Sequence, residues 1–271
     1  MKSLICYRDI KKGESFLQFA SIVLGSLESD IVLLGVRDKT QPASAQDTGE
    51  NYLLLPDRIL EKKTVQAGFL RAIIEETKKN LYDLVVIISQ DQPTIEELLL
   101  GTIADRVVKA ANTSVLIVNH PKRALKRLLV STGGHELSDQ TVDTGITIAE
   151  KIQTKVILLH VVASFPSMYA GLDRIDESLE EVLHTDTPLA RHLKEKAAEM
   201  IQKGIDAQIE LRHGLPSEEI VRATYRDEAD LLVIGYSEDT RFYRLFRDHL
   251  SLDIVDRAGC PVLVVNRKTP W

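Results

Sequence analysis

The sequence has few of the residues and motifs that covalent or metal chemistry requires. It contains two cysteines, Cys6 and Cys260, each inside or beside an aliphatic run and without CxxC spacing. Such cysteines are typically small buried hydrophobic groups and not redox-active or nucleophilic thiols. The seven histidines form no HxxxH or HExxH pair, so we expect no metal site. A GxSxG nucleophile motif is absent too, and no other catalytic constellation replaces it.

Long apolar runs and an excess of positive charge are also missing. No run approaches the roughly 18 residues that span a bilayer, and the segment MKSLICYRDIKKGESF carries charges too early for a signal peptide. We therefore expect a cytoplasmic protein without membrane insertion. The formal net charge of -6, with no local basic patch, argues against a nucleic-acid partner.

What the sequence does contain is a series of short aliphatic runs that alternate with stretches of helical period, and this series occurs twice. The alternation predicts an α/β fold with a parallel sheet covered by helices on both faces. Residues 83–118 align with residues 230–265 without a gap, which indicates a tandem duplication. The proline-containing segment 119–126 joins the halves, and we predict two domains, residues 1–120 and residues 125–268.

The two halves differ in their middles. The second half has an apolar loop, then a helical stretch from about residue 173 to residue 203 that is broken near Thr187-Pro188, where threonine can cap and proline can occupy the first turn. The corresponding part of the first half is the short polar segment KTQPASAQDTGEN. We predict that the first domain has lost one helix, which leaves a thinner sheet face for packing against the other domain or a partner.

With these features the chain resembles the universal stress protein family, in particular its tandem members. The resemblance covers nearly the whole chain, including the strand that ends at Gly235 and the terminal helix before each VLIV or VLVV strand. It implies two Rossmann-like domains of the adenine nucleotide alpha hydrolase-like type, each a five-stranded parallel sheet of order 3-2-1-4-5. In this family the final strands pair across a two-fold axis, so SVLIV and CPVLVV are expected to pair within this chain as a pseudo-dimer.

Nucleotide-binding members of the family carry glycine, two residues, glycine, nine residues, then glycine and serine or threonine. In the second half Gly235 fills the first position, whereas Glu238, Asp248 and His249 stand at the other three. Asp248 is suited to cap the helix that follows, and the His249 ring is placed to touch a phosphate if one were bound.

The same spacing can be laid on the first half. There Ile88 and Asp91 replace the first pair of glycines, while Gly101 and Thr102 retain the last two positions. Thr102 together with Asp105 also fits a capping box, which gives these residues a structural interpretation beside the phosphate role.

Binding members also place an aspartate at the end of the first strand, where it reads adenine. This sequence has Arg8, followed by Asp9, in the first half, and Thr132, Gly133 and Gly134 in the second. Arg8 cannot accept from the adenine amino group, although Asp9 could if the loop shifted by one residue. The Gly133-Gly134 pair is expected to form a loose turn after its strand.

Acids at the motif positions predict that nucleotide binding is lost. A carboxylate about 5 Å from a phosphate repels each unit of its charge by about 3 kcal/mol at an effective dielectric near 20, or roughly a hundredfold in affinity. Asp91 and Glu238 fall at the same position of the repeat, so both halves have an acid where the backbone must approach an anion.

The sequence therefore predicts a non-enzymatic stress-response regulatory or binding protein with no cofactor. Its partner is expected to be a protein or another copy of the chain, with contact surfaces at the apolar loop 164–172 and the arginine-aromatic cluster 241–247. Two alternatives stay open: a protein that binds or slowly hydrolyses ATP or another adenine nucleotide, or a sensor of another small ligand. The remnants of the nucleotide site are Gly101, Thr102, Gly133, Gly134 and Gly235.

Overall fold

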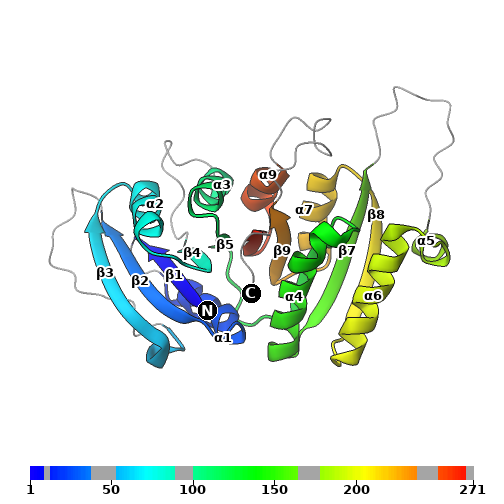
Figure 1. Cartoon of the computed structure of the whole chain (residues 1–271), viewed down its shortest axis with the longest axis horizontal. Helices are drawn as coiled ribbons and strands as arrows, with labels where there is room; N and C mark the ends of the chain where they lie inside the picture. Colours follow the sequence, from blue (N-terminus) through cyan, green and yellow to red (C-terminus); the bar gives the residue numbers. More distant parts are fainter. Residues whose placement is uncertain (9–12, 38–52, 89–99, 164–177, 237–249, 267–271) are drawn as a thin grey trace, which may run out of the picture.

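The computed structural model describes residues 1–8, 13–37, 53–88, 100–163, 178–236 and 250–266 (Figure 1). Five of the positions discussed above lie outside these ranges: Asp9, Asp91, Glu238, Asp248 and His249. The proposed contact surfaces 164–172 and 241–247 lie outside them as well.

The described residues form one ten-stranded sheet of order β3-β2-β1-β4-β5-β10-β9-β6-β7-β8. The strands are β1 (Lys2–Tyr7), β2 (Asp30–Arg37), β3 (Ile59–Gln66), β4 (Leu84–Ile88), β5 (Ser114–Val118), β6 (Arg127–Thr132), β7 (Lys155–Ala163), β8 (Ala207–Gly214), β9 (Leu231–Tyr236) and β10 (Val262–Asn266). Counted from its own first strand, each half has the order 3-2-1-4-5, as predicted. Most of these strands are buried on both faces, which explains their near-continuous aliphatic sequences.

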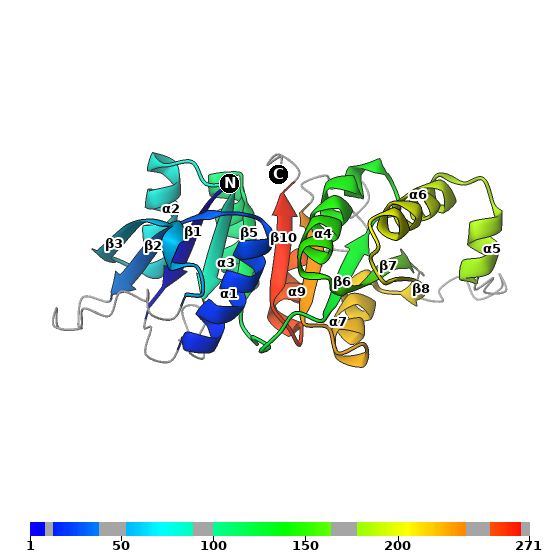
Figure 2. The same ribbon diagram turned by 90° about the horizontal axis from the view of Figure 1, so that it is seen from below.

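The two halves join at the middle of the sheet, where β5 and β10 pair antiparallel. Leu263 pairs with Leu116, and Val262 pairs with Ile117. Figure 2 shows β10 beside β5 at the centre of the molecule, with the first half on one side and the second half on the other. The other strand pairs of the described sheet are parallel. The predicted pseudo-dimer within one chain is confirmed.

Helices cover both faces of the sheet. They are α1 (Glu14–Ser26), α2 (Phe69–Lys79), α3 (Leu100–Ala111), α4 (Asp139–Ile152), α5 (Leu179–His184), α6 (Pro188–Gln202), α7 (Pro216–Arg226) and α9 (Leu250–Arg257). Helices α2, α3, α7 and α9 pack on one core, and helices α1, α4 and α6 pack on the other. Figure 2 is seen from the side of α1, α4 and α6. The α/β class with both sheet faces covered is thus confirmed.

The predicted break in the long helical stretch of the second half lies between α5 and α6. Thr187 is the N-cap of α6, with its hydroxyl accepting from the Ala190 N–H at 3.2 Å, and Pro188 occupies the first turn. Ser178 begins α5 with a capping box that includes Glu181. The cap and the proline fix the start of α6, which brings its buried face onto the sheet.

The first half has less described helix at the corresponding place. Between β2 and β3 the described residues 53–58 form only the short 3-10 helix η2 (Pro56–Arg58), while residues 38–52 lie outside the described ranges. Leu60 of the edge strand β3 is 61% exposed. The loss of one helix from the first domain therefore stays a prediction.

One hydrogen-bond arrangement occurs in both halves. The N–H of Asp83 donates to the Lys2 carbonyl at 2.8 Å, and the Asp83 carboxylate accepts from the Lys2 N–H at 2.7 Å. Asp230 does the same in the second half: its N–H donates to the Arg127 carbonyl at 2.9 Å, and its carboxylate accepts from the N–H groups of Lys126 and Arg127 at 2.8 and 2.9 Å. These aspartates align in the sequence repeat, so the duplication has kept the contact that ties the fourth strand of each half to the first.

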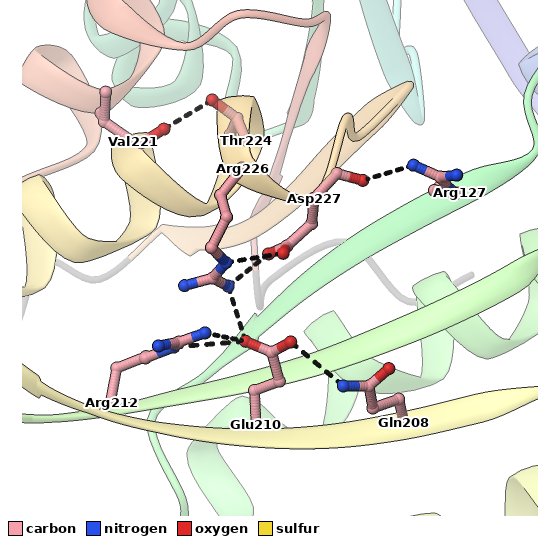
Figure 3. A network of polar contacts seen from close by, with 8 residues as sticks. All are labelled: Arg127, Gln208, Glu210, Arg212, Val221, Thr224, Arg226 and Asp227. Carbon is pink, nitrogen blue, oxygen red and sulfur yellow. Dashed lines mark hydrogen bonds and ion pairs between the residues drawn. The ribbon is translucent and has the colours of Figure 1, made fainter.

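Ion pairs attach one helix of each half to the edge strand. In the first half, Lys63 of β3 binds Glu76 of α2 at 2.7 Å. In the second half the signs are exchanged, and Glu210 of β8 accepts from Arg226 of α7 at 2.6 Å (Figure 3). Arg226 also pairs with Asp227.

The network of Figure 3 extends to the beginning of β6. Glu210 also accepts from Arg212 at 3.0 Å, and Arg127, the first residue of β6, donates to the Asp227 carbonyl at 3.1 Å. The involvement of Arg127 places this end of the network near the amino ends of the parallel strands. We interpret the network as a structural tie, because ligands of open α/β sheets bind at the opposite, carboxyl ends.

The two cysteines are buried, as predicted. Cys6 and Cys260 are free thiols with no exposed surface. Burial raises the pKa of Cys6, and it raises that of Cys260 to about 12, so neither thiol is ionised at neutral pH.

Candidate functional site

The candidate site lies where the parallel strands end at their carboxyl edge. Strand order reverses between β1 and β4 in the first half and between β6 and β9 in the second, and such switch points are where α/β proteins hold ligands. The second half is the better described of the two. Its crevice begins with the turn that follows Thr132 and with Gly235, the last residue but one of β9.

The turn after β6 is tightly held, and the expectation of a loose turn was wrong. The Gly133 N–H donates to Ser138 Oγ at 2.9 Å, and the Gly134 N–H donates to Thr132 Oγ1 at 3.1 Å. Gly134 has a φ of +76°, and a Cβ there would collide with Leu189 Cδ1 and lie 2.9 Å from His160 Cε1. Both its backbone conformation and its surroundings therefore require glycine.

Two histidines from different elements bind Thr132, the last residue of β6. His192 of α6 is buried, and its Nε2 lies 2.7 Å from Thr132 Oγ1. His160 of β7 places Nδ1 3.0 Å from the Thr132 carbonyl oxygen. On its other side, His192 Nδ1 lies 3.2 Å from Asp139 Oδ1. The result is a chain of contacts from Asp139 through His192 to Thr132.

The environment keeps both histidines neutral. Burial lowers the pKa of His160 more than its hydrogen bond to the Thr132 carbonyl raises it. Burial also lowers the pKa of His192, although the nearby Asp139 carboxylate acts in the opposite direction. Neutral His192 can donate from Nδ1 to Asp139 and accept at Nε2 from the Thr132 hydroxyl.

This chain of contacts resembles a catalytic relay in outline only. Thr132 is 3% exposed, and its hydroxyl already accepts from the Gly134 amide. The Gly133 amide is bound to Ser138, so neither of these two amides is available to stabilise an oxyanion. Within the described ranges no group of histidine, cysteine and acidic residues could hold a metal ion.

Gly235 is close to the first turn of α4. A Cβ at Gly235 would lie 2.7 Å from Thr141 Oγ1, so glycine is needed there for packing whatever its relation to a ligand. The Thr141 hydroxyl is buried and has no hydrogen-bond partner in the described part of the chain. Gly235 itself is exposed. This is the one predicted motif glycine of the second half that the structure describes.

The first half places a cation where binding members are expected to read adenine. The guanidinium carbon of Arg8 lies 4.9 Å from the centroid of the Phe69 ring, which is the distance of a cation–π contact. Phe69 is the first residue of α2, so Arg8 connects the end of β1 to that helix.

The other remnants in the first half lie in a helix. Gly101 and Thr102 are inside α3, which is helical from Leu100 onward, so Thr102 is not the N-cap and the capping-box interpretation was wrong. Asp105 instead accepts from Lys109 within the helix at 2.7 Å and from the Tyr236 hydroxyl at 3.2 Å.

The contact between Tyr236 and Asp105 joins the two halves of the chain. Tyr236 follows Gly235 directly, and Asp105 lies one helical turn after Gly101. Sequence reasoning did not find it, because the partners are 131 residues apart. His192 was also missed as a member of the site. The helical spacing of Leu189, His192 and Leu193 could have indicated that His192 faces the core.

Comparisons with known proteins agree with this architecture. The sequence model of the universal stress protein family matches residues 37–119 and 124–266. A universal stress protein of Methanocaldococcus jannaschii is 26% identical over 151 residues, which are 56% of this chain and 88% of that protein. The universal stress protein E homolog of Haemophilus influenzae is 27% identical over 202 residues, which are 71% of this chain and 64% of that protein.

Among solved structures, a universal stress protein from Archaeoglobus fulgidus has the same fold. It superposes with a TM-score of 0.65 at 15% identity, covering 98% of this chain and 96% of that chain. No helix among the described residues is both long and apolar enough to cross a membrane. Since the family model matches most of the sequence and matches it in both halves, the chain belongs to the universal stress protein family.

Proposed function

We propose that this protein is a non-enzymatic regulatory or binding member of its family, acting in the cytoplasm, that has lost the ability to bind ATP. The observation that carries the proposal is that the protein's own side chains pack against the end of β6 and the turn that follows it. Leu189 of α6 and His160 of β7 pack on Gly134, and His192 is bonded to Thr132. In nucleotide-binding relatives, the end of this strand is expected to contact the adenine ring.

Charge supports the same conclusion. The second-half motif has Glu238 and Asp248 at glycine positions, and the first-half motif has Asp91. Each carboxylate near a bound phosphate would cost about 3 kcal/mol per unit of phosphate charge at an effective dielectric near 20. Arg8, at the end of β1, supplies donors and no acceptor for the adenine amino group.

Calorimetric titration of the full chain with MgATP tests this proposal. We expect no measurable heat from the wild type, and binding after the triple change Glu238→Gly, Asp248→Gly and His249→Ser. The charge-only variant Glu238→Gln with Asp248→Asn should recover part of that affinity, because it removes the repulsion but leaves the bulk. A matched variant with the same change in net charge on exposed residues, Asp186→Asn with Glu195→Gln, should not bind.

The alternative function is binding of ATP or another adenine nucleotide through a rearranged loop. One observation favours it: the exposed Gly235 lies beside the Thr141 hydroxyl, which is buried and lacks a hydrogen-bond partner in the described residues. Saturable heat from the wild type would support this alternative and reject the loss of binding. A further variant, Thr141→Val, would then weaken binding if that hydroxyl contacts the ligand.

With no ligand of its own, the protein would act by contact with another macromolecule. We propose a protein partner or a second copy of the chain, bound through the apolar loop 164–172 or the arginine-aromatic cluster 241–247. The composition of both segments supports this role, because aromatic residues and arginine are enriched at protein interfaces.

A further inference from the structure

The contact between His192 and Thr132 depends on His192 being uncharged. We propose that His192 and Thr132 form an acid-sensitive latch, which holds the turn between β6 and α4 closed at neutral pH and releases it when His192 is protonated. His160 is not part of the switch, because its Nδ1–H donates to the Thr132 carbonyl in either protonation state. The device goes beyond the proposed function, since it operates whether or not a nucleotide binds.

The hydrogen-bond pattern around His192 is complete only in one protonation state. Asp139 can only accept while it is ionised, so the Nδ1 atom of His192 must donate to it. The Nε2 atom is then an acceptor, and the Thr132 hydroxyl donates to it at 2.7 Å. The lone pairs of that hydroxyl remain available for the Gly134 N–H, which donates to it at 3.1 Å. Every donor in this chain has an acceptor.

Protonation of His192 disrupts this chain of hydrogen bonds, because Nε2 then becomes a donor. The new Nε2–H would face the hydroxyl hydrogen of Thr132, which must rotate away into a site where the side chain is almost fully buried. A buried polar hydrogen without an acceptor costs about 1–3 kcal/mol. The hydroxyl oxygen would then have to accept from both Gly134 and His192, so the hydrogen bond that holds the turn is weakened.

Neighbouring charges act on protonated His192 in both directions: Asp139 stabilises the cation, while Lys196 and His135 oppose it. Once protonated, His160 and His192 would both be cations within hydrogen-bond distance of Thr132. The titratable and charged groups that act on them come from each surrounding element: His135 from the turn, Asp139 from α4, Lys196 from α6 and His213 from β8. Asp139 is the anion of this set. Of the cations, Lys196 is already paired with Asp143, which reduces its effect.

The closed turn contacts helix α6 at the carboxyl end of β6. While Gly133 and Gly134 are bound to Ser138 and Thr132, the turn packs against Leu189 of α6. Helix α6 is anchored separately, because its Leu193 and Met200 are fully buried in the core. Release of the latch therefore frees the turn and leaves the helix in place, which uncovers the carboxyl end of β6.

Hydrogen exchange on the full chain tests the latch. The measured quantity is the protection of the backbone amides in the peptide that spans residues 131–138, corrected for the intrinsic effect of pH on exchange. Protection in the wild type should fall several-fold between pH 7.5 and pH 5.5, while a peptide from β4 should not change. In His192→Gln, whose side-chain oxygen can still accept from Thr132 but does not titrate, most of this fall should disappear.

The control variant is His120→Gln, which removes an exposed histidine from the segment between the domains. It should behave like the wild type. Equal protection at both pH values in the wild type would overturn the proposal, as would a pH effect in His192→Gln equal to that of the wild type.

If the variants do not fold, nuclear magnetic resonance of the wild type tests the latch by following the titration of His192 directly. At pH 7.5, His192 should be neutral with its proton on Nδ1, and its titration should coincide with changes in the amide signals of Gly133 and Gly134. Titration of His192 without any change at these glycines would contradict the latch.

Discussion

Leu116 of β5 pairs directly with Leu263 of β10, and these two leucines occupy the same position of the sequence repeat. The neighbouring pairs are Val262 with Ile117 and Val264 with Val115. In the repeat, Val115 aligns with Val262 and Ile117 aligns with Val264, so the first pair is equivalent to the second. An approximate two-fold axis therefore passes between Leu116 and Leu263. The chain closes its own dimer, and the last strand of each half covers an edge that would otherwise be open.

Replacing Leu116 or Leu263 by alanine should lower the free energy of unfolding by about 2–5 kcal/mol. Both side chains are fully buried in the same core, so each change leaves a cavity beside the axis. The two losses should be similar because the environments are related by the repeat. Denaturant unfolding followed by circular dichroism measures them. Leu81→Ala, at a site that is 91% exposed, is the control and should change stability by no more than about 0.5 kcal/mol.

Asp83→Ala and Asp230→Ala should each destabilise the protein by about 1–2 kcal/mol, because each leaves strand-end amides without their carboxylate acceptor. The asparagine variants should lose less, since an amide oxygen can still accept. The same denaturation assay provides the values. A neutral result for both alanine variants would show that water replaces these carboxylates without cost.

Glu76→Gln should destabilise the protein at neutral pH by about 1–2 kcal/mol. Burial by itself would raise the pKa of Glu76, but the hydrogen bonds from Lys63, Tyr82 and Asn80 lower it overall. A lowered folded-state pKa means that this stabilisation is present above about pH 4.5, the usual value of the unfolded chain, and is lost as pH falls through the folded-state pKa.

The difference in unfolding free energy between wild type and Glu76→Gln should accordingly shrink as the pH is lowered from 7 to 3. Glu61→Gln is the matched control, because Glu61 pairs with the same Lys63 at 3.2 Å but is largely exposed. Its effect should stay below about 1 kcal/mol. A Glu76 effect that does not vary with pH would contradict the assignment of the stabilisation to the ionised carboxylate.

Gly134→Ala should destabilise the protein by more than Gly204→Ala. Both glycines have positive φ, +76° and +68°, so alanine is strained at each by about 1–2 kcal/mol. Nothing lies within 4 Å of a Cβ at Gly204, whereas a Cβ at Gly134 meets Leu189 and His160. The excess loss at Gly134 therefore measures how tightly the turn is packed. Thermal unfolding of the two variants measures both losses. Equal losses would show that Leu189 of α6 moves aside at little cost when a Cβ is added at residue 134.

The sequence was sufficient to predict the fold because its signals are local or repeated. Aliphatic runs mark the strands, Thr187-Pro188 marks the start of α6, and the gap-free repeat with the family resemblance predicts the pairing of β5 with β10. The capping box at Thr102 was wrong because the helix already includes Leu100, a boundary that side-chain patterns locate poorly.

The site was predicted less completely, for a physical reason. Thr132 and His192 are 60 residues apart, and their hydrogen bond depends on how α6 is placed over β6, which no spacing in the sequence records. The Tyr236–Asp105 contact depends likewise on the packing of the two halves. The resemblance to the family drew attention to Gly235 as a motif residue and to Gly133 and Gly134 at the end of the first strand, but the close packing that demands glycine at 134 and 235 comes from tertiary neighbours.

Native mass spectrometry of the full chain, purified without added nucleotide and then incubated with millimolar MgATP, determines whether the protein has lost ATP binding. We expect the mass of the protein alone before incubation and no specific ATP adduct afterwards. Adenine nucleotide bound at close to one per chain in either sample would show that the site is functional.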